Sequence, residues 1–145
     1  MIYLDDFVTK YKWKRIDFDN SFWFQCNDLT RQWLKERDQI QYRPLGSNWV
    51  KLIAKNPDYY LPHPLKWIKN NINKHNQIPK RGDIVILWIP TATWHIAVVT
   101  GALPWVNSLT IFEQNGWKWT TTGVWVDVCR IRKITYRNVL GWITW

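Results

Sequence analysis

Six consecutive apolar residues, Ile84 to Ile89, directly follow the turn-forming segment Pro79 to Asp83. An apolar run of this length after a turn with Pro and Gly predicts a buried strand. The β-branched segment Trp94 to Thr100 predicts a second strand that ends at Gly101, and Ser108 to Gln114 alternates as a third strand would. Three glycines punctuate further short extended segments toward the C-terminus: Gly116, Gly123 and Gly141. The C-terminal part of the chain therefore predicts an antiparallel sheet of about five or six strands.

The N-terminal part carries helical periodicity instead. Ile2 to Trp13 has the apolar spacing of a short amphipathic helix, which would pack over the core. In Asn27 to Gln39 three apolar side chains share one face, which predicts a second helix that begins at or just after Cys26. The polar side chains of this helix are expected to face water: Arg31, Lys35, Glu36, Arg37 and Asp38.

The segment Tyr42 to Pro64 is rich in proline and predicts mostly connection, with a short helical piece near Ser47 to Ala54. Helices first and strands afterwards predict an α+β domain, with the helices packed on the antiparallel sheet. The length of 145 residues and the absence of a composition shift predict one domain over residues 1–145.

The formal net charge of +9 predicts a basic surface, which attracts nucleic acid, acidic lipid headgroups or anionic polymers of a cell wall. Lys and Arg are spread along the chain without a run of five or six, which argues against nucleic-acid binding. The 13 Trp exceed what a core of this size needs, so some indoles are expected at the surface or in a groove. Met1 to Asp6 lacks the features of a secretory signal and no segment could span a bilayer, so we expect no membrane insertion.

The two cysteines stand in different settings. Cys129 closes the alternating segment Val124 to Cys129, where a small buried apolar group is the simplest prediction. A disulfide between the two cysteines stays open. Cys26 lies among polar and acidic residues at the start of the predicted helix. This setting suits a nucleophile, which in cysteine enzymes acts as a thiolate paired with a histidine.

The three histidines differ in their surroundings. His63 lies between two prolines and His75 in a polar run, so both are expected at the surface. His95 opens a predicted strand, where its ring is either a core group bonded to backbone or an edge group facing a cleft. Glu113 and Asn115 end the next predicted strand, and antiparallel pairing could bring them beside the imidazole. The alternative for Glu113 is a surface acid paired with a lysine.

The loop before Cys26 has acidic residues at alternating positions. The ligand positions 1, 3, 5, 7 and 12 of an EF-hand loop correspond to Asp17, Asp19, Ser21, Trp23 and Asp28, and position 7 uses its backbone carbonyl. Phe22 stands where an EF-hand needs Gly, and the last ligand is Asp instead of Glu, so this is not an EF-hand module. The spacing predicts a calcium site that would fix the loop and the helix start together, whereas the simpler alternative is two aspartates that cap a turn.

Five separated blocks together resemble the CHAP family, the cysteine- and histidine-dependent amidohydrolases/peptidases of bacteria and their phages. These blocks are Phe24 to Leu29, Arg81 to Val85, His95 to Val99, Phe112 to Asn115 and Gly141 to Ile143. The resemblance covers most of the chain and implies a papain-like (NlpC/P60-like) α+β core that cleaves amide bonds in peptidoglycan. It implies Cys26 as nucleophile, His95 as general base and acid, Glu113 as the group that orients His95, and Asn115 as a fourth polar member.

Those implied roles agree with the physical chemistry of the residues. The positive end of a helix dipole and a nearby imidazolium both favour a cysteine thiolate. The Cys26 backbone N–H and the Gln25 side-chain amide are the candidate donors to the oxygen of a tetrahedral intermediate. The acidic loop is also similar to that of calcium-binding CHAP domains in staphylococcal phage endolysins, which implies a structural Ca²⁺.

Three classes of function follow. The first is a peptidoglycan hydrolase, either an endopeptidase or an N-acetylmuramoyl-L-alanine amidase, which acts in phage lysis from the host cytoplasm or as part of a virion beside other virion proteins. Its positive charge would favour wall teichoic acid as a further partner. The second is an inactive wall-binding module or virion structural component. The third, a nucleic-acid binder, depends only on charge and aromatic content.

Overall fold

The computed structural model describes residues 1–20, 25–41, 49–71, 77–89, 93–103, 107–117, 125–126 and 128–145. The helices are α1 (Leu4–Tyr11), α2 (Cys26–Asp38), α3 (Trp49–Lys55) and α4 (Pro57–Tyr60). Helices α1 and α2 confirm the two predicted from periodicity, and α3 confirms the short helical piece predicted near Ser47 to Ala54. The short helix α4 lies in the proline-rich stretch predicted as connection, and it begins at a proline, which is well suited to the first turn of a helix.

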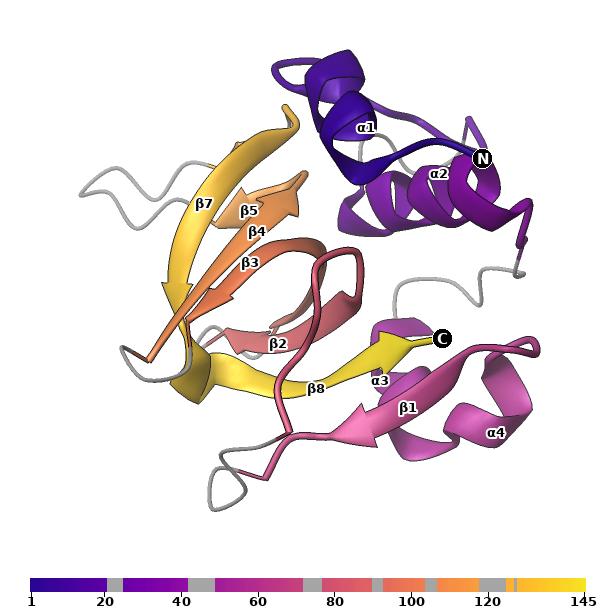
Figure 1. Cartoon of the computed structure of the whole chain (residues 1–145), viewed down its shortest axis with the longest axis vertical. Helices are drawn as coiled ribbons and strands as arrows, with labels where there is room; N and C mark the ends of the chain where they lie inside the picture. Colours follow the sequence, from indigo (N-terminus) through magenta and orange to yellow (C-terminus); the bar gives the residue numbers. More distant parts are fainter. Residues whose placement is uncertain are drawn as a thin grey trace.

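Six strands form one antiparallel sheet in the order β1-β8-β2-β3-β4-β7 (Figure 1). Their bounds are β1 (Lys66–Lys69), β2 (Ile84–Ile89), β3 (Thr93–Leu103), β4 (Ser108–Glu113), β7 (Arg130–Thr135) and β8 (Val139–Thr144). A second, two-stranded sheet pairs β5 (Gly116–Trp117) with β6 (Trp125–Val126), and a 3-10 turn, η3 (Tyr136–Asn138), precedes β8. The α+β class and the expected number of strands are confirmed.

Residues Ile84 to Leu87 of β2 are buried on both faces of the sheet. Ile84 and Ile86 contribute to a core shared with the helices, whereas Val85 and Leu87 belong to a second cluster on the opposite face. Successive strand residues point to opposite faces, so a strand covered on both sides needs apolar residues at every position. This explains why β2 has an uninterrupted apolar sequence.

Helices α1 and α2 lie together over one end of the sheet, and α3 and α4 lie beside β1 and β8 (Figure 1). Phe7 of α1 connects these layers because its ring centroid lies 5.1 Å from that of Trp33 on α2 and 6.1 Å from that of Phe112 on β4. This aromatic packing fixes α2, and therefore its N-terminus, relative to β3 and β4.

Two strand predictions need correction. The second predicted strand does not end at Gly101, because β3 continues to Leu103 through a register shift between Val99 and Gly101. A glycine at such a bulge lets the strand bend without ending. Strand β1 was missed because two prolines, Pro62 and Pro64, closely precede it, and it pairs only with β8 in the sheet.

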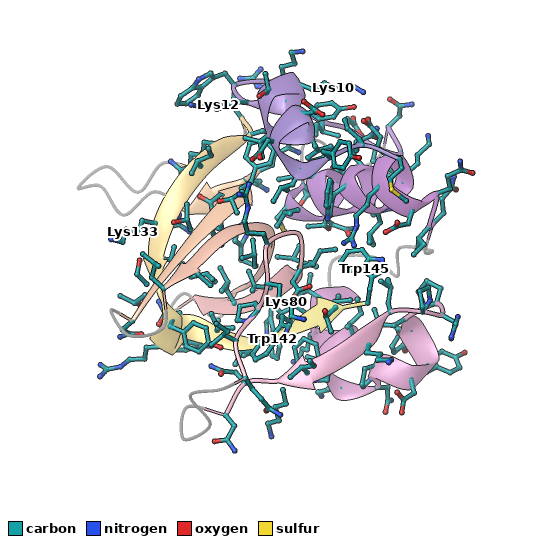
Figure 2. All side chains as sticks on the ribbon, viewed as in Figure 1. Lys10, Lys12, Lys80, Lys133, Trp142 and Trp145 are labelled. Carbon is teal, nitrogen blue, oxygen red and sulfur yellow. The ribbon has the colours of Figure 1, made fainter. Side chains whose placement is uncertain are left out.

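The surface carries charge and exposed indoles, as the composition indicates. Figure 2 shows Lys10, Lys12 and Lys133 projecting outward from the helical layer and from β7. Trp13 is 67% exposed, which confirms that some indoles reach the surface, whereas Trp142 is buried. None of the helices in the described ranges combines the length and apolarity needed to cross a bilayer.

Candidate active site

Cys26 is the first residue of α2, and its thiol lies at the positive end of that helix. The residue before it, Gln25, is extended, and its N–H donates to Oδ2 of Asp28 at 2.8 Å in the manner of a capping box. Cys26 is half-buried and not in a disulfide. Local capping therefore determines where the helix begins and holds the thiol at its end.

His95 lies on β3 and is 2% exposed, and its Nε2 is 3.0 Å from Oε2 of Glu113 at the end of β4. Burial lowers the pKa of His95, but its hydrogen bonds to Cys26 and Glu113 and the charges of both outweigh burial and raise this pKa to about 9. Because Nε2 is bonded to Glu113, Nδ1 is the ring nitrogen left for the thiol. The structure therefore brings Cys26, His95 and Glu113 together.

Glu113 has no exposed surface, so the alternative of a surface acid paired with a lysine is wrong. Arg130 Nε donates to its Oε1 at 3.1 Å and Arg132 Nη2 to its Oε2 at 2.8 Å. Burial raises the pKa of Glu113, but the hydrogen bond and charge of His95, followed by Arg132, lower it to about 2. A carboxylate at neutral pH therefore holds the imidazole.

Arg130 and Arg132 were not identified from the sequence. Both lie on β7, which pairs with β4 so that Glu113 stands opposite Arg130. Their two-residue spacing places both side chains on one face of the strand, and this spacing was the available signal. Only the pairing of β4 with β7 shows that this face meets Glu113.

Asn115 and Gln25 lie next to Gln114 and Cys26 in the chain. Asn115 follows β4 in a left-handed conformation with φ of 53°. Within the described residues, no hydrogen bond joins its side chain to Cys26, His95 or Glu113. The backbone carbonyl of Gln25 accepts a hydrogen bond from Gln114 Nε2 at 3.0 Å, and Gln114 was also missed from the sequence.

Three of the five predicted calcium ligands lie together. Carboxylate oxygens of Asp17, Asp19 and Asp28 all lie within 4.8 Å of one another. Asp28 is buried, and burial followed by the charges of Asp19 and Asp17 raises its pKa to about 6. Asp17 Oδ1 is buried and has no hydrogen-bond partner among the described residues. These features fit a site for a hard cation. The other two predicted ligands, Ser21 and Trp23, lie outside the described residues. The histidine His75, which was predicted at the surface, also lies outside them.

The prediction that Arg31 faces water is wrong. Arg31 is 8% exposed, its Nη1 donates to Oδ2 of Asp19, and its guanidinium carbon lies 4.3 Å from the ring centroid of Phe18. Helical periodicity assigns polar residues to the outer face, whereas here the acidic loop folds over α2 and draws the guanidinium inward. A buried charge of this kind needs an opposite charge beside it.

Cys129 is a buried thiol, as predicted, although it lies just before β7 and not within a strand. Its Sγ donates to Oε1 of Gln114 at 3.1 Å, and burial raises its pKa to about 12. Both cysteines are free. Cys129 therefore does not suit a nucleophile, and no disulfide joins the two.

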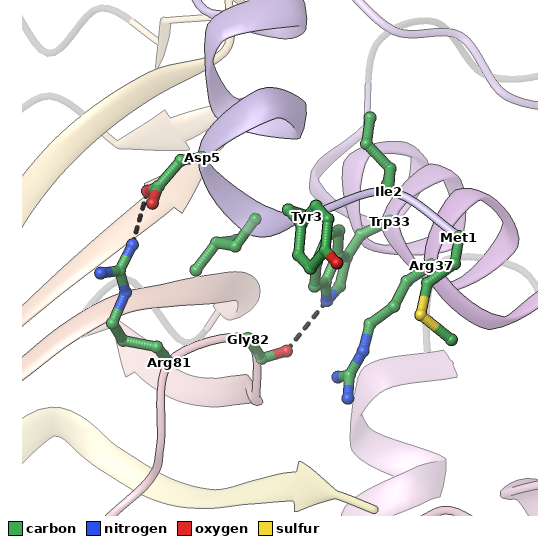
Figure 3. Close-up of a pocket in the computed structure, with 9 residues that line it drawn as sticks. Met1, Ile2, Tyr3, Asp5, Trp33, Arg37, Arg81 and Gly82 are labelled. Atoms are coloured by element: carbon green, nitrogen blue, oxygen red, sulfur yellow. Dashed lines mark hydrogen bonds and ion pairs between the residues drawn. The ribbon is translucent and has the colours of Figure 1, made fainter.

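A separate hollow of about 330 Å³ lies between the N-terminal segment, α2 and the turn before β2 (Figure 3). Trp33 Nε1 donates to the carbonyl of Gly82 at 2.9 Å across its floor, and Arg81 pairs with Asp5 at its rim. None of the predicted site residues lines it. The hollow is therefore distinct from the Cys26–His95 site.

The fold and site together define an α+β domain with a cysteine at a helix start facing a histidine–glutamate pair. Neither a family model nor a curated protein matches the sequence. Among solved structures, the wild-type endolysin LysIME-EF1 is similar, with a TM-score of 0.72 and 23% sequence identity. The match covers 99% of this chain and 64% of the endolysin, so the chain spans less than two thirds of that protein. This likeness shows a fold of the kind found in an endolysin.

Proposed function

We propose that this chain is a cysteine-dependent peptidoglycan hydrolase of the CHAP type. The observation that supports this proposal is His95, whose buried ring bonds to both Cys26 and Glu113. A nucleophile, a base and a group that orients the base form the set of roles that amide cleavage by a thiol requires. The similarity in fold to an endolysin adds support.

The proposed reaction begins with the Cys26 thiolate beside the His95 imidazolium. The sulfur forms a bond to the carbonyl carbon of the amide, and the resulting oxyanion accepts hydrogen bonds from the Cys26 N–H and the Gln25 side-chain amide. His95 then gives its proton to the amide nitrogen, the C–N bond breaks and the amine leaves. Water attacks the thioester after giving a proton to His95, and the thiolate is released. Glu113 keeps the imidazole oriented throughout.

The test uses purified bacterial walls and mass spectrometry of the released fragments. We expect wild type and Cys129→Ala to release the same fragments and Cys26→Ala to release none. New peptide amines would identify an endopeptidase, whereas peptides freed from muramic acid would identify an amidase. Absence of any fragment with wild type, or release by Cys26→Ala, would refute the proposal.

We also propose that the acidic loop binds Ca²⁺ through Asp17, Asp19 and Asp28, with Ser21 and Trp23 as further ligands. The bound cation would supply positive charge that offsets the mutual repulsion of three carboxylates. Its role is structural, because Asp28 also caps the helix that starts at Cys26. Calorimetry on chelator-stripped protein should show Ca²⁺ binding that Asp17→Asn weakens and that Asp58→Asn, an exposed aspartate on α4, does not. No binding at millimolar Ca²⁺ would contradict the site.

The role of Gln25 has its own test. Removal of one oxyanion donor costs about 10²-fold to 10³-fold in kcat. Gln25→Ala should therefore lower kcat by about this factor while the far-ultraviolet circular dichroism stays that of wild type. An unchanged kcat would exclude Gln25 as a donor.

The basic surface supports a further partner, the anionic wall teichoic acid. Lys12, Lys14 and Lys133 are exposed, and the chain carries a net charge of +9. Attraction of this kind is screened by salt. We expect binding to intact walls to weaken as salt rises and to fall when teichoic acid is removed; binding that responds to neither would refute this partner.

A further inference from the structure

Gln114, the residue directly after β4, has a side chain with no exposed surface and a full set of hydrogen bonds. Its Oε1 accepts from the Ile16 N–H at 2.7 Å and from Cys129 Sγ at 3.1 Å. Its Nε2 donates to the carbonyls of Ile16 at 2.6 Å and Gln25 at 3.0 Å. A primary amide has two N–H donors and two acceptor positions, and all four are used here.

These four bonds join parts of the chain that are far apart in sequence. Ile16 begins the acidic loop, Gln25 is the residue directly before the nucleophile, and Cys129 precedes β7. The two bonds to Ile16 hold that residue as a neighbouring strand would. The bond to the Gln25 carbonyl holds the chain immediately before Cys26. The acidic loop is therefore tied to the sheet at its first residue and again next to the nucleophile.

Glu113 and Gln114 are consecutive, and successive residues of an extended chain point in opposite directions. The Glu113 side chain reaches His95, whereas the Gln114 side chain reaches the loop and the start of α2. One strand end thus contacts both partners of the proposed reaction, the imidazole through Glu113 and the nucleophile through Gln25. The distance between thiol and imidazole depends on both contacts.

We propose that Gln114 is a positioning residue that sets Cys26 against His95. This inference rests on the proposed cysteine-dependent activity and adds a residue that acts without touching the substrate. Misplacement of a reacting group by about 1 Å can cost about 10²-fold in rate. Loss of the Gln114 bonds should therefore slow steps that need the Cys26–His95 geometry while substrate affinity stays the same.

The experiment compares Gln114→Met, Gln114→Glu and Leu109→Ala with wild type. Methionine keeps the length of the side chain but forms none of the four bonds. Glutamate keeps the acceptor oxygen and can donate at most one proton, so it cannot serve both carbonyls. Leu109 is a buried residue of β4 in the core cluster on the opposite face, so its truncation loosens the same strand without touching the loop. Folding of each variant is checked by circular dichroism below its melting temperature.

Two readouts separate positioning from general stability. The first is the rate at which iodoacetamide alkylates Cys26, followed by mass spectrometry so that Cys129 is counted separately. The second is kcat and KM on purified walls. We expect Gln114→Met to lower the alkylation rate and kcat by about tenfold to a hundredfold with KM unchanged. Gln114→Glu should lower both in the same direction, and Leu109→Ala should leave both as in wild type.

The proposal is overturned if folded Gln114→Met or Gln114→Glu alkylates and turns over at the wild-type rate. It is equally overturned if Leu109→Ala lowers both rates as much as the Gln114 variants do. Failure of the proposed function would be seen differently, as walls that wild type does not cut or that Cys26→Ala still cuts. The alkylation rate does not need a wall substrate, so it tests the positioning of Cys26 in either case.

Discussion

Replacing Glu113 by glutamine removes the charge that three cationic groups share. Glu113 is fully buried and accepts hydrogen bonds from His95, Arg130 and Arg132. Glutamine has nearly the same shape, so the change tests charge and hydrogen bonding with little change in packing. The variant leaves a buried imidazole without its carboxylate partner, and we expect both stability and activity to fall.

The size of the stability loss follows from the pKa of Glu113. This pKa lies at about 2 instead of the ordinary 4.5, and one pKa unit corresponds to about 1.4 kcal/mol. The native contacts therefore favour the carboxylate by about 3 kcal/mol, which agrees with the cost of about 3–5 kcal/mol for removing one partner of a buried ion pair. Because a general base such as the proposed His95 contributes about 10²-fold or more, and Glu113 orients it, kcat should fall by about 10²-fold.

The pH dependence of this loss has a definite sign. The stabilisation from Glu113, whose pKa is lowered, is complete above pH 4.5 and is lost as the pH falls through about 2. The stabilisation from His95, whose pKa is raised, is complete below pH 6.5 and is lost as the pH rises through about 9. The difference in unfolding free energy between wild type and Glu113→Gln should therefore be largest between pH 4.5 and 6.5.

Urea unfolding of both proteins across this pH range measures the difference. The matched control is Glu36→Gln, which removes a partly exposed carboxylate paired with Lys10 on the helical layer. Solvent screens this pair at the surface, so the control should lose much less stability than Glu113→Gln. A loss below about 1 kcal/mol for Glu113→Gln, or a loss that does not vary with pH, would refute the view of Glu113 as a buried charged partner of His95.

Three further predictions test other parts of the structure. NMR titration should give His95 a pKa of about 9 in wild type and a lower pKa in Cys26→Ala, because the hydrogen bond and charge of Cys26 raise the pKa of His95. Equal pKa values in the two proteins would show that Cys26 and His95 do not interact. Arg31→Gln removes the guanidinium that pairs with Asp19 and would compete with Ca²⁺ for its carboxylate. Calorimetry should therefore show Ca²⁺ binding that is tighter by about tenfold, or about 1.4 kcal/mol. Weaker binding would contradict this competition between Arg31 and Ca²⁺. Gly141→Ala places a methyl group 2.5 Å from the backbone of β1. This overlap should lower the free energy of unfolding by about 1–3 kcal/mol, measured by thermal or urea unfolding. Gly101→Ala, where the nearest neighbouring atom lies 3.8 Å from the new methyl group, should lower it less.

Much of the fold could be predicted from the sequence because its signals are local. The start of α2 was placed at Cys26 because the helical period begins there, and the capping contact between Gln25 and Asp28 lies within the same turn. The strand β2 was predicted because burial on both faces requires an apolar residue at every position. Such patterns arise from neighbours in sequence and need no knowledge of the tertiary structure.

The residues that were missed or misplaced depend on contacts between distant segments. Arg31 looks like a solvated helical residue until the acidic loop lies over it. Arg130 and Arg132 look like the outer face of an edge strand until β7 pairs with β4 and brings them to Glu113. Gln114 is an amide within a strand pattern, and nothing local indicates that it meets a loop 98 residues away. Polarity and period give the face of an element but not what covers that face.

Asp28 connects the acidic loop to Cys26 in a way that neither feature shows alone. Its Oδ2 accepts the Gln25 N–H at the start of α2, and its carboxylate also lies within 4.8 Å of those of Asp17 and Asp19. Its pKa of about 6 means that burial and the two neighbouring charges oppose its ionisation, whereas the cap bond favours it. Any positive charge placed among the three carboxylates would favour the charged Asp28 and so strengthen the cap. The charge state of the loop therefore acts on the residue that begins the helix, and Cys26 is that residue.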